Sequence, residues 1–169
     1  KGSVLRENSI IDSPSIYGLS KLIAEKIILD KFPAIILRLP SIIGLGTHGW
    51  INSVVYKLKK NKEITLSNYK FNNFMHASEL PNIVFKLSKS KIKSDIFLVA
   101  CSNIVQSKDV VKSLKNYLNS SSNIKVNKNK NSSYVISSKK LNHYYKTIKV
   151  EDVLKIFSIE LKNGKMFAK

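Results

Sequence analysis

Two short apolar segments constrain the fold of this chain more than any other feature. Residues 34–39 and 95–100 are nearly continuous runs of aliphatic and aromatic residues, the pattern of strands buried on both faces, as in a parallel sheet covered by helices. Helical spacing or capping residues mark the segments around them, at residues 15–31, 50–59, 78–88, 107–117 and 150–161. Alternation of strands and helices predicts an α/β fold.

Shorter elements fill the remaining segments. We expect a loop over residues 1–12 and a glycine-containing loop over residues 40–49. Residues 119–133 are polar and predict a loop with one weak strand at its centre. Short strands or extended pieces are expected at residues 64–66, 71–77 and 134–136. These small, mixed elements fit a lobe added to the edge of a doubly wound sheet.

The net charge of +18 raises the question of an anionic partner. A basic nucleic-acid-binding domain without catalysis is one alternative. However, Arg occurs only at positions 6 and 38, although Arg is the preferred reader of guanine and phosphate. The lysines are scattered along a chain that is also rich in Asn, Ile and Ser. We therefore favour biased composition over a nucleic-acid partner.

The cysteine content and the lack of long apolar runs indicate the cellular compartment that we expect for this chain. The single cysteine, Cys101, excludes an internal disulfide, and it follows an apolar run that predicts a buried thiol. No run reaches the roughly 18 apolar residues of a membrane span, and no signal segment opens the sequence. We expect a cytoplasmic protein without a membrane partner.

Tyr17 and Lys21 lie one helical turn apart on the same predicted helix face. A free tyrosine is a poor base at neutral pH, and a nearby cation favours its phenolate form. Such a tyrosine can accept a proton from a hydroxyl group or return one to a carbonyl. Taken alone the pair is a weak signal, because this spacing occurs by chance in many helices.

The surroundings of the pair resemble the extended short-chain dehydrogenases and reductases, which include NAD-dependent epimerases and dehydratases. Residues 13–25, SPSIYGLSKLIAE, are similar to the active-site helix of that family. Residues 37–44, 73–80, 96–105 and 137–141 resemble its later motifs, in the same order. The resemblance implies part of a Rossmann-type sheet in residues 1–49. It implies a mostly substrate-binding α+β lobe in residues 50–169, with residues 78–100 returning to the sheet.

The resemblance also implies roles for individual residues. Tyr17 would be the catalytic acid/base, and Lys21 would bind the ribose of NAD or NADP beside it. Pro40 would lie next to the nicotinamide. The substrate would contact three further residues, namely Ser41, His48 and Asn52.

The sequence departs from the family pattern at several points. The glycine-rich phosphate loop and the catalytic Ser or Thr are absent, so the chain looks like a C-terminal portion, and we expect both elements upstream of Lys1. Ser41 replaces the usual Asn, and Asn72 replaces an Arg that holds the substrate diphosphate. The substrate is therefore a nucleotide sugar or another small hydroxy or keto compound. An inactive fragment of such an enzyme is a further alternative.

The histidines give no sign of a metal site. His48, His76 and His143 lack ligand spacing and a nearby carboxylate cluster. His76 follows Phe74 and Met75 and is expected to be a structural histidine. The oligomeric state is not determined by the sequence, and a homodimer is one option that it leaves open.

Overall fold

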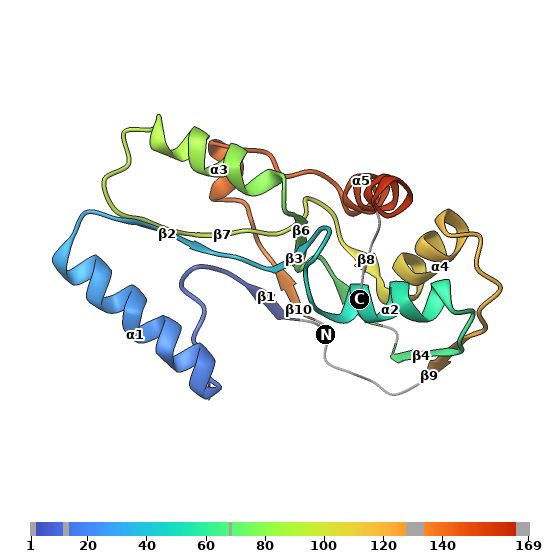
Figure 1. Ribbon diagram of the computed structural model, residues 1–169. Helices are drawn as coiled ribbons and strands as arrows, with labels where there is room; N and C mark the ends of the chain where they lie inside the picture. Colours follow the sequence, from blue (N-terminus) through green and yellow to red (C-terminus); the bar gives the residue numbers. More distant parts are fainter. Residues whose placement is uncertain (1–2, 12–13, 68, 128–133, 165–169) are drawn as a thin grey trace.

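The computed structural model describes residues 3–11, 14–67, 69–127 and 134–164 (Figure 1). Its helices are α1 (Ile16–Lys31), α2 (Trp50–Lys59), α3 (Glu79–Ser88), α4 (Ser107–Tyr117), the short 3-10 helix η1 (Leu141–His143) and α5 (Val150–Asn163). Its strands are β1 (Ser3–Leu5), β2 (Ile35–Arg38), β3 (Ser41–Ile43), β4 (Ile64–Ser67), β5 (Lys70–Phe71), β6 (Phe74–His76), β7 (Asp95–Leu98), β8 (Val105–Gln106), β9 (Ile124–Asn127) and β10 (Tyr134–Ile136).

Most strand pairs are parallel. The parallel pairs are β1 with β10, β2 with β7, β3 with β6 and β4 with β9, whereas β5 and β8 are antiparallel. Parallel neighbours need long crossover connections, usually helical, and here each pair is linked across at least one helix. The predicted α/β architecture and the strands at residues 34–39 and 95–100 are confirmed.

Two hydrophobic clusters form the core. The larger one joins α2, β4, α4 and α5, and its centre includes Val55, Leu114 and Phe157. The smaller one joins α3 to β7 through Ile83 and Phe97. Figure 1 shows α3 above β7 on one side and α5 beside α4 on the other. The division of the chain into a sheet part and a substrate lobe stays a prediction.

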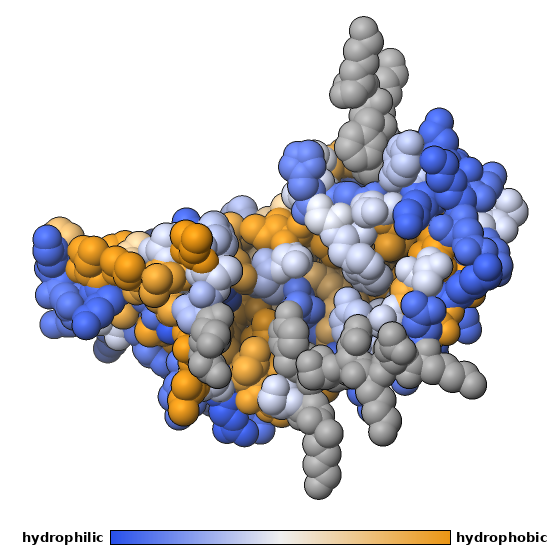
Figure 2. Space-filling view, turned by 90° about the horizontal axis from the view of Figure 1, so that it is seen from below, coloured by the Kyte–Doolittle hydropathy of each residue, from blue (hydrophilic) through white to orange (hydrophobic). Residues whose placement is uncertain are grey.

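Helix α1 contributes no buried residue to either cluster. Its aliphatic row, Ile16, Leu19, Ile23 and Ile27, is 48–90% exposed, and α1 projects from the body beside β2 (Figure 1). Figure 2 shows hydrophobic side chains gathered at this end of the molecule. The expectation that strand 34–39 is buried on both faces is wrong for this structure, because β2 pairs only with β7 among the described strands and its residues are half-buried.

Three short strands differ from the sequence prediction. Residues 1–12 and 40–49 were expected to be loops, but β1 and β3 form there, and β8 precedes α4. Each is only two or three residues long, and its partner lies far away in the sequence. Local periodicity carries no such pairing information. Part of the predicted 119–133 loop, residues 128–133, lies outside the described residues.

Cys101 is buried, as predicted, and its thiol donates a hydrogen bond to the carbonyl of Phe74 at 3.0 Å. Burial raises the pKa of this thiol to about 12, and the negative charge of Glu79 acts in the same direction. In the described part of the chain, no helix combines the length and the apolar composition that a membrane crossing requires. The same residues contain no group of three or more His, Cys, Asp or Glu side chains placed to hold a metal ion.

Candidate active site

The N-terminus of α1 is fixed by a capping serine. The Ser15 hydroxyl accepts the backbone N–H of Gly18 at 3.1 Å, as an N-cap residue does. A Cβ at Gly18 would meet the Cβ of Pro14 at 3.3 Å, so the small residue suits this close turn. The first helical turn therefore presents Tyr17 in a defined direction.

Tyr17 and Lys21 lie together on the surface of α1. The Lys21 ammonium is 5.3 Å from the centroid of the Tyr17 ring, within the range of a cation–π contact. The Tyr17 side chain is 72% exposed. Among the described residues, no carboxylate lies within ion-pair distance of Lys21. Both polar groups are thus available to a bound molecule.

Arg38 at the end of β2 joins α1 to the sheet. Its guanidinium donates two hydrogen bonds to the Glu25 carboxylate, at 2.6 and 3.0 Å, and one to the carbonyl of Glu7 at 3.1 Å. The hydrogen bond to Glu25 raises the pKa of Arg38. The Glu7 carboxylate in turn accepts the backbone N–H of Leu98 on β7. The sequence analysis gave Glu25 and Glu7 no role, because this pairing depends on how α1 crosses β2.

An open hollow of about 600 Å³ separates α1 from β2. We call it the α1–β2 hollow. Tyr17, Lys21 and Ile28 line it from the helix, and Ile36 and Leu39 line it from the strand. Its wall is mainly apolar, with the Tyr17–Lys21 pair as its polar feature beside the Arg38–Glu25 pair. The wall is of the kind that accepts a flat ring against aliphatic side chains.

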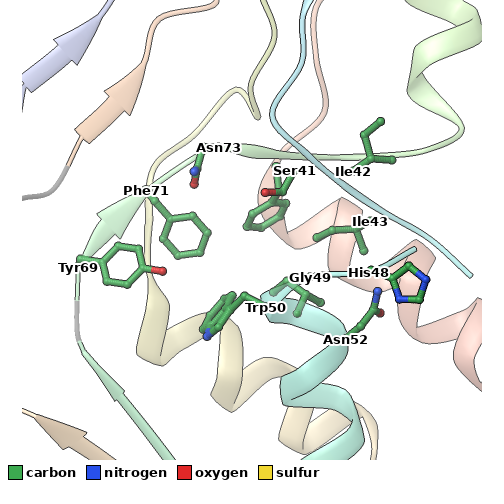
Figure 3. Close-up of a pocket in the computed structure, with 12 residues that line it drawn as sticks. Ser41, Ile42, Ile43, His48, Gly49, Trp50, Asn52, Tyr69, Phe71 and Asn73 are labelled. Atoms are coloured by element: carbon green, nitrogen blue, oxygen red, sulfur yellow. The ribbon is translucent and has the colours of Figure 1, made fainter. Parts of the chain in front are cut away.

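A second, smaller pocket of about 90 Å³, open to solvent, is lined by residues that follow Pro40 in the chain (Figure 3). We call it the Trp50 pocket. It brings together three residues that the sequence analysis assigned to the substrate, Ser41, His48 and Asn52. Pro40 itself is half-buried and lines neither cavity, but Leu39 lines the hollow and Ser41 lines the pocket. Along the chain, only Pro40 separates the linings of the two cavities.

An aromatic wall forms one side of the Trp50 pocket. The Trp50 and Phe71 rings meet edge to face with centroids 5.9 Å apart, and the Tyr69 and Phe71 rings are tilted at 5.3 Å. Figure 3 shows these three rings grouped together, with Ser41 and Asn73 above them in this view. Sequence reasoning missed Tyr69, Phe71 and Asn73 as site residues. The aromatic density of residues 69–74 was the available signal.

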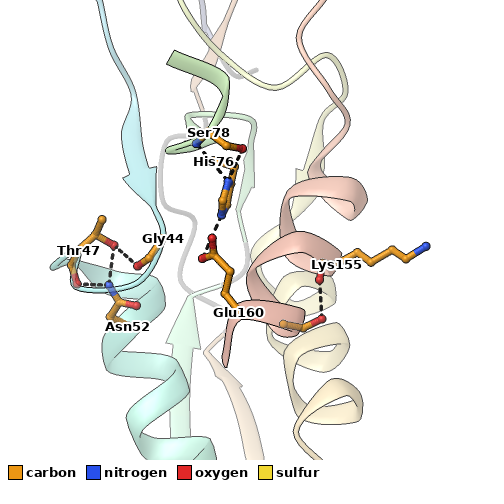
Figure 4. Close-up of polar contacts among 8 residues, drawn as sticks. Gly44, Thr47, Asn52, His76, Ser78, Lys155 and Glu160 are labelled. Atoms are coloured by element: carbon orange, nitrogen blue, oxygen red, sulfur yellow. Dashed lines mark hydrogen bonds and ion pairs between the residues drawn. The ribbon is translucent and has the colours of Figure 1, made fainter. Parts of the chain in front are cut away.

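Asn52 holds the loop that precedes α2 (Figure 4). Its amide nitrogen donates to the Thr47 carbonyl and, at 3.0 Å, to the Thr47 hydroxyl, which donates to the Gly44 carbonyl at 2.9 Å. Gly46 and Gly49 have φ values of 75° and 141°, a region that favours glycine and lets the loop turn tightly here. Asn52 thus lines the pocket, but its amide nitrogen is used by the loop.

Asn72, which stands where the related family carries a diphosphate-binding Arg, faces away from the pocket. Its side chain is buried and donates to the carbonyls of Cys101 at 3.2 Å and Ile136 at 2.8 Å. It also accepts the backbone N–H of Ile136 at 2.9 Å. These contacts occupy the amide and fix β10 to the body of the protein.

His76 is a buried structural residue, as the sequence predicts. Its Nδ1 accepts the backbone N–H of Ser78 at 3.3 Å and lies 2.8 Å from the Ser78 hydroxyl (Figure 4). Its Nε2 lies 3.2 Å from a carboxylate oxygen of Glu160, an ion-pair distance without hydrogen-bond alignment. His76 lines neither cavity. Its contacts connect β6 to α3 and α5.

No protein-family model and no curated protein matches the sequence. Solved structures do match. UDP-glucuronic acid 4-epimerase from Bacillus cereus, in complex with NAD, is 16% identical with a TM-score of 0.80, and the match covers 99% of this chain and 58% of that one. dTDP-glucose 4,6-dehydratase from Bacillus anthracis, in complex with NAD, is also 16% identical with a TM-score of 0.80, covering 98% and 58%. The chain has the fold of these enzymes.

A third match supports the same conclusion. UDP-N-acetylglucosamine 4-epimerase from Bacillus cereus is 18% identical with a TM-score of 0.74, and the match covers 94% of this chain and 59% of that one. The Rossmann-type fold implied by the sequence resemblance is therefore confirmed. The chain spans 58–59% of the length of these three proteins.

Proposed function

We propose that this chain forms the catalytic part of an NAD(P)-linked oxidoreductase, epimerase or dehydratase, with Tyr17 as acid/base and Lys21 as its partner. The observation that carries the proposal is the position of the pair. Both side chains reach the wall of the α1–β2 hollow, and the Lys21 ammonium lies 5.3 Å from the Tyr17 ring centroid. A phenol and an ammonium placed together beside an apolar hollow suit proton transfer to a substrate oxygen.

The residues of the hollow fit the nicotinamide end of the cofactor. The Lys21 ammonium is a donor without a carboxylate partner among the described residues, so it can hold ribose hydroxyls. Ile28, Ile36 and Leu39 offer an apolar surface to a flat ring. NAD or NADP would supply or take up the hydride when bound.

The proton chemistry belongs to the protein. In the proposed mechanism Tyr17 accepts the proton of a substrate hydroxyl, with the Lys21 ammonium 5.3 Å from its ring centroid. In the reverse direction, the Tyr17 hydroxyl donates a proton to a carbonyl oxygen. The Arg38–Glu25 pair holds α1, which carries Tyr17, against β2, the strand that leads to Pro40.

The substrate would reach Tyr17 from the side of the Trp50 pocket, because Leu39 lines the hollow and Ser41, two residues later, lines that pocket. Ser41 and His48 offer polar groups there, and Asn52 holds the loop that precedes α2. The three neighbouring enzymes are named for nucleotide-sugar substrates. For this protein we propose a small hydroxy or keto compound as the substrate. Nucleotide sugars are one class of such compounds.

The activity is proposed for the whole protein, because the chain spans 58–59% of these neighbours. In the test, the complete protein is incubated with NAD or NADP and a panel of nucleotide sugars and cyclic alcohols, and nicotinamide reduction and product formation are followed. Tyr17→Phe should lower turnover on the order of 10²- to 10⁴-fold. Tyr56→Phe is the matched control, because Tyr56 is an exposed tyrosine with Lys62 5.7 Å from its ring, outside both cavities. Full activity in Tyr17→Phe would end the proposal.

A further inference from the structure

Among the residues that the structure describes, none that lines the Trp50 pocket carries a fixed charge. These lining side chains are aromatic, aliphatic or neutral polar, and none of them is Lys, Arg, Asp or Glu. This is unexpected in a chain with 29 Lys and Arg residues. The lining also includes the imidazole of His48, whose side chain is exposed.

The direction of the side chains around β5 explains why Lys70 does not place its charge in the Trp50 pocket. Tyr69 and Phe71 line the pocket, whereas Lys70 between them lines a different hollow together with Asp109 and Glu151. Alternating residues of an extended segment point to opposite sides. Lys70 is thus directed toward acidic residues and away from the Trp50 pocket.

Asn72, the residue after β5, does not supply the missing cation. Asn72 is buried, and its amide is used by Cys101 and Ile136. A phosphate or carboxylate inside the pocket would lose water without gaining a cationic partner, and desolvation of an unpaired charge is strongly unfavourable. An uncharged ring loses little on entering and gains contact with the Trp50, Tyr69 and Phe71 rings.

We infer that the Trp50 pocket binds an uncharged ring that carries hydroxyl or carbonyl groups, and that it rejects a carboxylate or phosphate of similar size. Ser41 lies across from the Trp50 ring and supplies a neutral hydrogen-bonding group (Figure 3). The inference that this ring is part of the substrate rests on the proposed function. The inference that the pocket binds such a ring does not. A nucleotide sugar would have to place its diphosphate outside this pocket.

Trp50 provides a direct readout, because it is the only tryptophan in the chain and lines the pocket. Its emission is titrated with two matched pairs of probes, benzyl alcohol against benzoate and methyl glucoside against methyl glucuronide. A fifth probe, UDP, tests a free diphosphate. The first pair represents an aromatic alcohol and the second a sugar ring, so the two pairs distinguish the source of the ring.

We expect the uncharged member of at least one pair to bind on the order of tenfold more tightly than its carboxylate, and UDP to be weaker than that member. Ser41→Asp should weaken the uncharged probe on the order of tenfold, because it adds a carboxylate to the wall. Ser41→Asn, the neutral control, should change its affinity less than about threefold. Ser41→Lys should favour the carboxylate probe, because it adds the missing cation.

Equal or tighter binding of both carboxylates, or of UDP, overturns the inference, and so does unchanged Trp50 emission with every probe. Tyr17→Phe separates this result from the proposed function, because Tyr17 does not line the pocket. The variant should keep the charge preference while losing turnover. Retained turnover in that variant would contradict the proposed function alone, whereas a lost charge preference in the unmodified protein would contradict the pocket assignment alone.

Discussion

Arg38 and Glu25 form a bidentate ion pair that joins β2 to α1, with hydrogen bonds of 2.6 and 3.0 Å. The two side chains are 23% and 14% exposed. Since α1 buries no residue of its own, this pair is its main polar connection to the sheet. The position of Tyr17 therefore depends on a contact two helical turns away from it.

Glu25→Gln should lower the free energy of unfolding by about 1–2 kcal/mol, because a half-buried guanidinium loses its charged partner. Urea denaturation of the purified chain measures this. Glu63→Gln is the control, since Glu63 pairs with Lys125 at 2.8 Å on the open surface, and the unfolding midpoint should not change. An equal effect of the two substitutions would mean that the Arg38 pair does not stabilise the fold.

Asn72→Ala should destabilise the protein by about 2–3 kcal/mol, because it leaves the carbonyl and N–H groups of Ile136 without their partner. Thermal or urea unfolding gives the value. Asn142→Ala replaces an exposed asparagine and should have almost no effect. A mild Asn72 phenotype would show that β10 is held by its pairing with β1 instead.

The raised pKa of Cys101 predicts that the folded protein loses stability at alkaline pH. Its pKa is raised from 9.0 to about 12 by burial, so the folded state keeps the proton that the unfolded chain releases. The stabilisation is complete below pH 9.0 and is lost as the pH rises toward 12, by about 1.4 kcal/mol per pH unit at most.

Urea unfolding between about pH 8 and 11 follows the onset of this loss, which begins above pH 9.0. Cys101→Ala should flatten the alkaline decline, although it costs stability at neutral pH. The thiol should also resist a disulfide reagent in the folded protein and react freely in denaturant. Rapid labelling of folded protein at neutral pH would contradict its burial.

Helix α1 should exchange its amide hydrogens faster than α5 does. Its aliphatic row is exposed, whereas α5 buries Val153, Leu154 and Phe157. Helices without buried contacts open at low free energy. Hydrogen–deuterium exchange read by mass spectrometry compares the two helices in one sample. Equal protection would show that something covers α1 in solution.

The elements that carry their own pattern could be predicted from sequence. The five α-helices, β2 and β7 follow from apolar periodicity, capping residues and apolar runs. β1 and β3 could not, because three residues have no usable period and their partners are distant. The exposure of α1 was equally hidden, since an apolar stripe shows what a helix could bury and not what is present to cover it.

The candidate site could be predicted only in part, because some of its contacts join residues that are distant in the sequence. Ser41, His48 and Asn52 were named, and they line one pocket. The loop-holding contact of Asn52 to Thr47 and the aromatic wall of Tyr69 and Phe71 depend on the turn of the 44–49 loop and the approach of β5. The roles of Tyr17, Lys21 and Pro40 remain predictions that only chemistry can test.

The central claim is that Tyr17 and Lys21 act as one unit, and a double-mutant cycle on turnover tests it most directly. In the complete protein, Tyr17→Phe and Lys21→Met should each reduce turnover, and the double variant should be no slower than about the slower single variant. Losses that multiply would mean that the two residues act independently. Turnover that survives Tyr17→Phe would contradict the account altogether.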